Sequence, residues 1–247
     1  MLAGLVAGVP LTRERQAGGD CSNASYRHLS PGSPQSMPIP SPVRLFTYKQ
    51  THDTGFAPNP FHGYCTLATC KPQIRLHKRV GDWIAGFTSQ SLNKDGVGYE
   101  RLIYLMHVAE KLPFEIYHTD PRFAAKIPDQ DSKRCVETIG DNIYGIRDGT
   151  VFQIPNRDHD ISALPKDTSG KFALIATEFA YFGSEPIVIP EEVRPRIPVS
   201  QAGHGIQTKD PVRARAFVDF VLARGKGVHA RPKSWLTGDT TWRGIME

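Results

Sequence analysis

One segment of the chain concentrates side chains that could bind and act on a small molecule. It covers residues 53–72 and reads DTGFAPNPFHGYCTLATCKP. Three aromatic residues, Phe56, Phe61 and Tyr64, surround Asn59 in this segment. Flat rings stack on the face of a nucleobase, and an amide pairs with the donors and acceptors on its edge. The segment therefore predicts a base-binding pocket; the alternative is a loop whose aromatic rings pack into the core.

Two cysteines in the same segment are candidates for covalent chemistry. Cys65 and Cys70 are spaced C-x4-C, which differs from the C-x2-C spacing of zinc ribbons, and no second pair follows. We therefore expect no metal and no cofactor. Lys71 follows Cys70 directly and His62 precedes Cys65 by three residues, so either thiol could be a nucleophile beside a cation or a base. Buried, inert thiols are the alternative.

Charged residues supply further candidates. Asp53 and Asp141 are carboxylates that could serve a nucleotide-directed transferase or a glycosidic enzyme. Lys71 and Arg75 stand at the end of the aromatic segment and could hold a phosphate group.

Two short motifs add candidates for contacts to a base: Asp82, Asp141 and Asn142 for its edge, and Trp83 as a further stacking ring. Asp82 and Trp83 lie at a predicted turn, and Asn142 and Tyr144 follow Asp141 in the motif GDNIY. A carboxylate beside an amide suits a base, but the same residue types also form turns by bonding to their own backbone.

The sequence predicts short strands joined by long, ordered loops, and these elements must position the candidate residues. Alternating or continuous apolar patterns predict strands over residues 44–51, 83–88, 102–108, 151–154, 172–176 and 179–182. Residues 114–120 predict one or two helical turns. The clearest helix covers residues 212–224, because Asp210 can cap it, Pro211 suits its first position and Gly225 can end it. This order predicts an α+β domain built on a small curved sheet or a barrel.

Composition narrows the class of protein. The chain has 247 residues, of which 42 are glycine or proline (22 and 20), and such frequent breakers exclude long helices. No run of about 18 apolar residues is present to span a membrane, and four cysteines are too few for a disulfide framework. We expect a cytoplasmic protein. A net charge of +5 permits an anionic partner without identifying one.

The first 42 residues differ from the rest. Residues 30–42 read SPGSPQSMPIPSP, which predicts an extended, flexible leader, and residues 43–247 are expected to form the domain with its C-terminal helix and basic tail. Met37 is an alternative start, in which case residues 1–36 would not belong to the native protein. Phosphate loops of the Walker and dinucleotide types, the G-x-S-x-G elbow and the zinc deaminase signature are all missing from the sequence.

Four motifs together resemble one family. They are GFAPNPFHGYCTLATCKPQIR at residues 55–75, VGDWIAG at 80–86, LIYLMHV at 102–108 and GDNIY at 140–144. The chain resembles the second of the nucleotide-modification-associated domain families, which occur in bacteria and phages and are linked by gene context to modified DNA bases. The order of a first strand, an aromatic loop and a Gly-Asp turn also looks like the PUA-like class, which includes EVE and ASCH domains. That second resemblance implies a small barrel that holds a flipped or modified base.

These observations lead to one main hypothesis and two alternatives. The main hypothesis is a nucleobase-binding protein of DNA or nucleotide modification, whose partner is a nucleotide or DNA carrying modified bases. The first alternative is a nucleotide-directed transferase or glycosidic enzyme that uses a cysteine or an aspartate. The second is a non-catalytic scaffold for a modification enzyme encoded nearby.

Overall fold

The computed structural model describes residues 42–200 and 203–243, which belong to one compact unit, residues 41–247. The predicted leader lies outside the described residues except for Pro42, and so does the alternative start at Met37.

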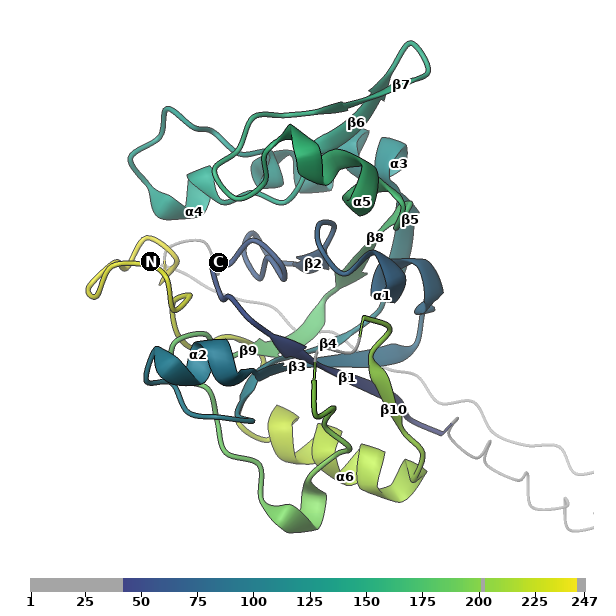
Figure 1. The fold of residues 1–247 in the computed structure, drawn as a ribbon, viewed down its shortest axis with the longest axis vertical. Helices are drawn as coiled ribbons and strands as arrows, with labels where there is room; N and C mark the ends of the chain where they lie inside the picture. The colour runs from purple at the N-terminus through teal and green to yellow at the C-terminus, as the bar shows by residue number, and fades with distance from the viewer. Residues whose placement is uncertain (1–41, 201–202, 244–247) are drawn as a thin grey trace, which may run out of the picture. The chain divides into compact units, whose positions relative to one another are not determined.

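The centre of this unit is a six-stranded sheet (Figure 1). Its strand order is β10 (Ile206–Thr208), β1 (Arg44–Gln50), β3 (Asp82–Thr88), β4 (Leu102–His107), β9 (Glu178–Tyr181) and β11 (Gly227–Val228). The pairs β1–β3 and β9–β11 are parallel, and the other three pairs are antiparallel. The sheet is therefore mixed.

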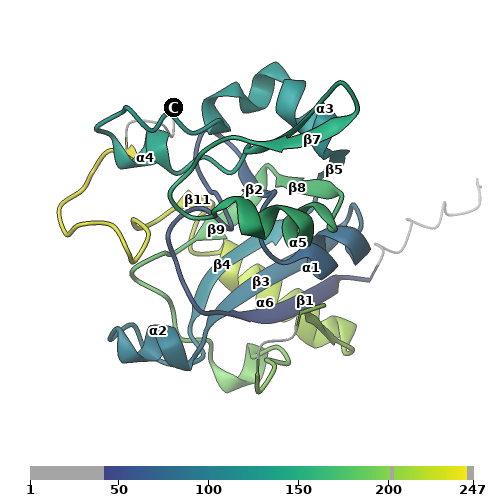
Figure 2. The same ribbon diagram turned by 45° about the horizontal axis from the view of Figure 1, so that its top comes forward.

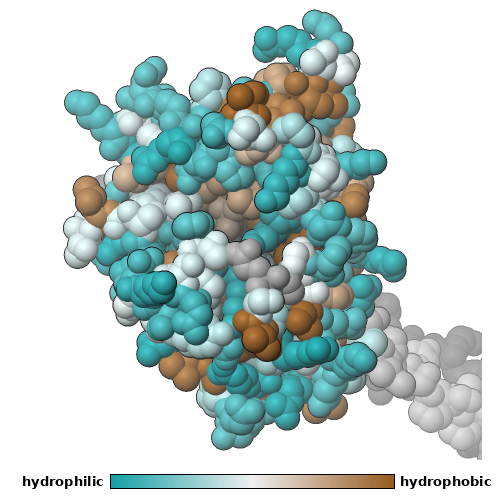
Figure 3. Space-filling view, in the orientation of Figure 1, coloured by the Kyte–Doolittle hydropathy of each residue, from teal (hydrophilic) through white to brown (hydrophobic). Residues whose placement is uncertain are grey.

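Two smaller sheets accompany it. One is antiparallel, with the order β2 (Cys65–Leu67), β8 (Phe172–Ala176) and β5 (Glu110–Pro113), and the other is the hairpin of β6 (Tyr144–Arg147) and β7 (Thr150–Gln153). Figure 3 shows apolar residues gathered over the hairpin, where Ile146 and Val151 are exposed.

The helices are short. They are α1 (Pro72–His77), α2 (Gln90–Lys94), α3 (Phe114–Thr119), α4 (Cys135–Thr138), α5 (Leu164–Thr168) and α6 (Pro211–Leu222), with 3-10 turns at Pro121–Lys126, Ile161–Ala163 and Glu191–Val193. Each helix in the described ranges is too short or too polar to pass through a bilayer.

Alternation along the strands divides the core between the two faces of the large sheet. Trp83, Ala85 and Phe87 of β3 pack toward α6, where they join Phe217 and Val218. On the opposite face Ile84 joins a second cluster that also contains Leu67 of β2 and Leu174 of β8. Figures 1 and 2 show the same arrangement, with α6 on one side of the sheet and β2, β8, α1 and α5 on the other.

The predicted elements are largely confirmed. Strands β1, β3, β4, β7, β8 and β9 lie within one or two residues of their expected limits, and α6 begins at Pro211 behind Asp210. The Asp210 side chain accepts hydrogen bonds from the backbone N–H groups of Val212 (2.9 Å) and Arg213 (3.2 Å), as a helix cap does.

The barrel alternative is wrong for the described residues. β10 and β11 are the two edges of the six-stranded sheet and do not pair with each other. The sheet buries one face under a helix and the other under a second sheet, so it has no need to close upon itself to form a core. The α+β prediction is confirmed by the mixed six-stranded sheet, the short helices and the helix near the C-terminus.

Candidate functional site

A cavity of about 680 Å³ opens between the end of β1, the start of α1 and the segment that leads into α5. This volume lies within the range of small-molecule sites, which is roughly 300–1,000 Å³. Its lining residues include polar and charged groups from all three segments: Gln50, His52, Thr54, Cys70, Lys71, Gln73, Arg157, Asp158, His159, Lys166 and Asp167.

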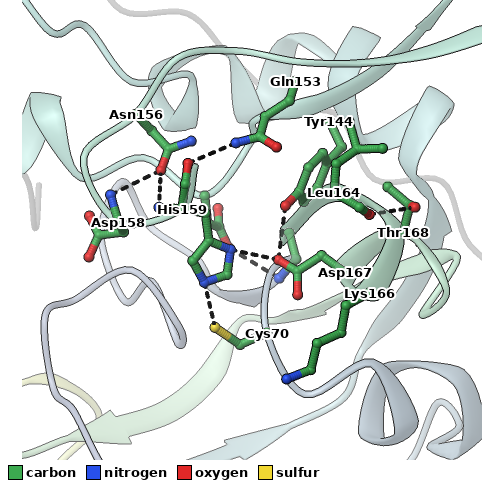
Figure 4. Close-up of polar contacts among 12 residues, drawn as sticks. Cys70, Tyr144, Gln153, Asn156, Asp158, His159, Leu164, Lys166, Asp167 and Thr168 are labelled. Atoms are coloured by element: carbon green, nitrogen blue, oxygen red, sulfur yellow. Dashed lines mark hydrogen bonds and ion pairs between the residues drawn. The ribbon is translucent and has the colours of Figure 1, made fainter. Parts of the chain in front are cut away.

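Three of these residues form a line of contacts on the cavity wall. The Sγ atom of Cys70 lies 3.3 Å from Nε2 of His159. The other ring nitrogen, Nδ1, lies 2.8 Å from Oδ2 of Asp167, in an ion pair whose direction departs from that of a well-aligned hydrogen bond. Figure 4 shows the imidazole standing between the thiol and the carboxylate. A thiol, an imidazole and a carboxylate in this order are the parts of a nucleophilic triad.

Buried donors hold the carboxylate of Asp167 in place. The Tyr144 hydroxyl donates to Oδ2 at 3.0 Å, and the Arg75 guanidinium lies 3.9 Å from Oδ1. Arg75 is fully buried and donates to the carbonyl oxygens of Cys70 (2.7 Å) and Phe172 (3.1 Å). One guanidinium therefore ties the loop that carries Cys70 to β8 and to α5, which carries Asp167.

The same contacts set the charges of the site. Burial lowers the pKa of His159, but the contacts with Asp167 and Cys70 outweigh burial and raise the pKa to about 10. Burial raises the pKa of Asp167, yet the contacts with His159 and Arg75 hold it below its ordinary value. At neutral pH the pair is an imidazolium facing a carboxylate.

The backbone at Cys70 is strained. Cys70 and Lys71 have φ angles of +51° and +38°, so two consecutive non-glycine residues have a left-handed backbone conformation. Such conformations cost free energy and persist where the surroundings enforce them, often at functional sites. Here Pro72 starts α1 directly afterwards, and the hydrogen bond from Arg75 fixes the Cys70 carbonyl.

Local turn chemistry positions His159. The Asn156 side chain accepts hydrogen bonds from the backbone N–H groups of Asp158 (3.0 Å) and His159 (2.7 Å), and the Gln153 amide donates to the His159 carbonyl at 2.8 Å. The ring of Phe56 meets the imidazole edge to face at 5.0 Å. Contacts to its backbone and to its ring therefore hold His159 in place.

Cations from two segments line the same cavity as the Cys70 thiol. Lys71 and Lys166 both line the cavity, and Arg157 lines it from the His159 segment. Burial lowers the pKa of Lys71, whose Nζ atom lies 4.9 Å from the centre of the Tyr48 ring. Within residues 42–200 and 203–243, no carboxylate lies within ion-pair distance of Lys71 or Lys166. The cavity can therefore accept an anion.

Comparison with models of known protein families shows which family the chain belongs to. The model of the family described as nucleotide modification associated domain 2 matches residues 43–239. The chain belongs to this family. No curated protein and no solved structure matches the chain.

In this nucleotide modification associated domain, some of the residues predicted from the sequence meet at the cavity. Phe56, Cys70 and Lys71 line it. Arg75 and Tyr144 lie behind Asp167, where both side chains are buried and already bonded.

A second group of predicted residues lies in a buried polar network of the core. Asn59 donates to the Ile139 carbonyl (3.1 Å) and accepts from Lys126 (2.7 Å). Asp141 accepts from Thr66 (2.8 Å) and Tyr117 (2.7 Å). Asn142 and Cys65 are also fully buried: the Asn142 amide donates to the Phe123 carbonyl at 3.1 Å, and burial raises the pKa of Cys65.

The remaining predicted residues lie elsewhere. Phe61 stacks on Trp235 at 5.2 Å, and Tyr64 meets Phe123 edge to face. Trp83 stacks on His107 at 4.6 Å, on the face of the sheet toward α6. Asp82 accepts from the Arg79 backbone N–H at 2.9 Å in the turn before β3.

Asp53 borders a second cavity of about 380 Å³. Its carboxylate accepts hydrogen bonds from the Tyr181 hydroxyl (2.5 Å) and the Lys233 backbone (2.9 Å). Burial raises the pKa of Asp53 to about 6.

His159, Asp167 and Lys166 are not among the residues predicted from the sequence. Their segment, RDHDISALPKDTSGK at residues 157–171, is polar, and its visible signal is the Asp160 cap of a 3-10 turn. A histidine and an aspartate eight residues apart have no fixed relation to a cysteine 89 residues earlier, so nothing in the spacing points to a triad. In the described ranges no three His, Cys, Asp or Glu side chains are grouped as they would be around a metal ion.

Proposed function

We propose that the chain binds a nucleotide in the 680 Å³ cavity and acts on it with Cys70 as the nucleophile. The observation that carries this proposal is the line of contacts from Cys70 through His159 to Asp167 on the cavity wall. Membership of the nucleotide modification associated domain 2 family supports a nucleotide as the ligand. A nucleotide, or DNA carrying a modified base, is the class of partner that follows.

Charge and shape assign the parts of the ligand. A phosphate group would lie against Lys71 and Lys166, since these cations are not neutralised by neighbouring carboxylates in the described ranges. A base would lie against Phe56, the aromatic residue that lines the cavity. Arg75 and Tyr144 act in this proposal through Asp167.

The chemistry needs an activated thiol. The nucleophile of a cysteine enzyme is the thiolate, and an adjacent imidazolium stabilises it as an ion pair. Nε2 of His159 is the group within reach of Cys70 Sγ, and Asp167 keeps the ring in its orientation. A reducing compartment such as the cytoplasm would keep this thiol free.

The aspartate version of the enzyme hypothesis has less support. Asp53 and Asp141 are buried, and their carboxylates already accept hydrogen bonds from neighbouring groups. Neither side chain lines the cavity that holds Cys70.

The test is the alkylation of individual cysteines by iodoacetamide, followed by peptide mass spectrometry with and without a panel of nucleotides and short DNAs with modified bases. Cys135 is the internal control because, like Cys70, it is partly exposed but lies outside the cavity. We expect Cys70 to react at least about tenfold faster than Cys135, since the imidazole of His159 lies 3.3 Å from the Cys70 thiol. A nucleotide in the cavity should protect Cys70 and leave Cys135 unchanged.

Charge variants make the test specific. Lys71→Ala and Lys166→Ala should weaken the protection by a nucleotide, and Lys94→Ala on α2, outside this cavity, should not. Equal reactivity of Cys70 and Cys135, with no protection by any nucleotide, would rule out the proposal and favour a scaffold.

A further inference from the structure

We propose that the Cys70 centre is an acyl-transfer site, which takes up an acyl group as a thioester on Cys70 and acts on nucleotides whose base bears an ester- or amide-linked substituent. This inference rests on the proposed function and deepens it, because it names the reaction and the substrate class.

The imidazole of His159 lies where acyl transfer requires it. His159 contacts Cys70 through Nε2 and Asp167 through Nδ1. Because the carboxylate occupies Nδ1, the imidazole exchanges its proton at Nε2, the nitrogen that faces the thiol. Acyl transfer needs this arrangement, because the nitrogen that faces the nucleophile must deliver its proton to the leaving group and then take one from the acceptor.

The cavity offers too few free carboxylates for glycosidic chemistry. Glycosidic cleavage uses two carboxyl groups, one as acid and one as base or nucleophile. Asp158 and Asp167 are the carboxylates among the cavity residues, and Asp167 is already engaged by His159, Tyr144 and Arg75. One carboxylate is left, which does not make the pair that glycosidic chemistry requires.

A lysine directly follows the nucleophile in the chain and lines the same cavity. Lys71 follows Cys70 in the chain, lines the same cavity and is partly desolvated. A positive charge in a desolvated site stabilises the oxyanion that forms when a thiolate adds to a carbonyl. The same lysine or Lys166 can hold a phosphate group of the nucleotide.

The reaction is balanced without a redox partner. The Cys70 thiolate attacks the acyl carbon, a C–S bond forms, and the carbonyl electron pair moves to oxygen. The pair returns, the bond to the amine or alcohol breaks, and that group leaves with the proton from His159 Nε2. Water or an amine then gives its proton to Nε2 and attacks the thioester, and the C–S bond breaks. The acyl product departs, and the thiolate and imidazolium are restored.

The test uses p-nitrophenyl acetate as an acyl donor and the intact chain. We expect a burst of one nitrophenolate per chain and one acetyl group on the Cys70 peptide. Cys70→Ala should abolish both, and Cys135→Ala should leave both unchanged. His159→Gln should slow acylation by at least about 100-fold, the lower part of the range for general acid–base catalysis.

The rate at which the acetyl group is lost distinguishes an acyl-transfer site from a reactive thiol that does not pass the acyl group on. We expect the acetyl thioester of the folded protein to decay at least about tenfold faster than that of the urea-unfolded protein at the same pH, because His159 activates the acceptor. Asp167→Asn should shift the pH profile of this decay, as expected of a positioning residue.

The outcomes distinguish the two proposals. If nucleotides protect Cys70 from iodoacetamide but no acetyl group is taken up, or if the acetyl group persists equally in folded and unfolded protein, the acyl-transfer inference is wrong and the proposed function stands. If Cys70 reacts no faster than Cys135 with either reagent, both fail.

Discussion

At the scale of single residues, the decisive feature is that one histidine is shared between a thiol and a carboxylate. The side chain of His159 is 18% exposed and that of Asp167 is 3% exposed, so their interaction is weakly screened by water. The guanidinium of Arg75 is completely buried, and its positive charge offsets the negative charge of the Asp167 carboxylate. Removing any of these groups would leave a partner buried without compensation, which is more costly than the intact arrangement.

The stability of the chain should depend on pH through His159. Its pKa is raised from 6.5 to about 10, so the stabilisation by the charged ring is complete below pH 6.5 and is lost as the pH rises through about 10. The pKa of Asp167 is lowered, so its contribution is present above the ordinary range of aspartate and is lost in acid.

We therefore predict that His159→Gln lowers the free energy of unfolding by about 1–3 kcal/mol at pH 6, because the buried Asp167 carboxylate loses its charged partner. The difference from the wild type should shrink toward pH 10. Urea unfolding at both values measures it, with the exposed His77→Gln as the control. A difference that grows with pH would contradict this prediction.

At the scale of elements, the site depends on segments whose own helices are very short. Helix α1 has six residues and α5 has five, too few to be stable by themselves. They are fixed instead by tertiary bonds, chiefly those of Arg75 to the carbonyl groups of Cys70, Phe172 and Asp167. In contrast α6 has twelve residues, a cap and an apolar face.

The cap of α6 permits a direct prediction. Asp210→Ala should lower the free energy of unfolding by about 1 kcal/mol, because two backbone N–H groups lose their acceptor. Asp219→Ala on the same helix is the matched control: its exposed ion pair with Arg215 is 3.6 Å long, and its loss should cost less than about 0.5 kcal/mol. Equal effects in urea unfolding would argue against the capping role.

Close packing in β3 leads to a second prediction at this scale. A Cβ atom on Gly86 would lie 2.3 Å from the Gln50 Oε1 atom and 2.4 Å from the Tyr104 ring. Gly86→Ala should therefore destabilise the chain by about 1–3 kcal/mol through overpacking. Because Gln50 lines the cavity, the variant should also weaken nucleotide protection of Cys70 under conditions where it remains folded. An unchanged melting temperature would contradict the packing argument.

At the scale of the whole molecule, residues 41–247 have a core of their own. Both faces of the six-stranded sheet are buried by segments of this unit, and the matched family covers residues 43–239. The C-terminal segment also belongs to it: Trp235 is buried, stacks on Phe61 and donates to the Thr54 carbonyl at 2.9 Å.

A shortened chain tests this independence. We predict that residues 41–247 alone melt within about 2–4 °C of the full chain, which corresponds to a change of 1 kcal/mol or less for a domain of this size. The rate of Cys70 alkylation should be unchanged. A loss of folded protein or a slower reaction would mean that residues 1–40 contribute to the fold or the site.

Much of the fold is determined by local sequence. The apolar pattern of residues 102–108 predicts a strand buried on both faces, and β4 is buried almost throughout. Asp210 and Pro211 fix the start of α6, since capping and the proline φ angle act within one turn. The sequence motifs were also sufficient for the family, which the match to residues 43–239 confirms.

Only the tertiary structure decided which polar residues meet. Sequence alone could not separate Cys65, buried in β2, from Cys70 at the cavity, because burial depends on which strand pairs with which. Asn59 and Asp141 had the residue types of a binding site and became parts of the core network, whereas His159 and Asp167 had no signal in their spacing. A triad is a relation between side chains from distant segments. Long-range packing brings those segments together, and no local pattern records that contact.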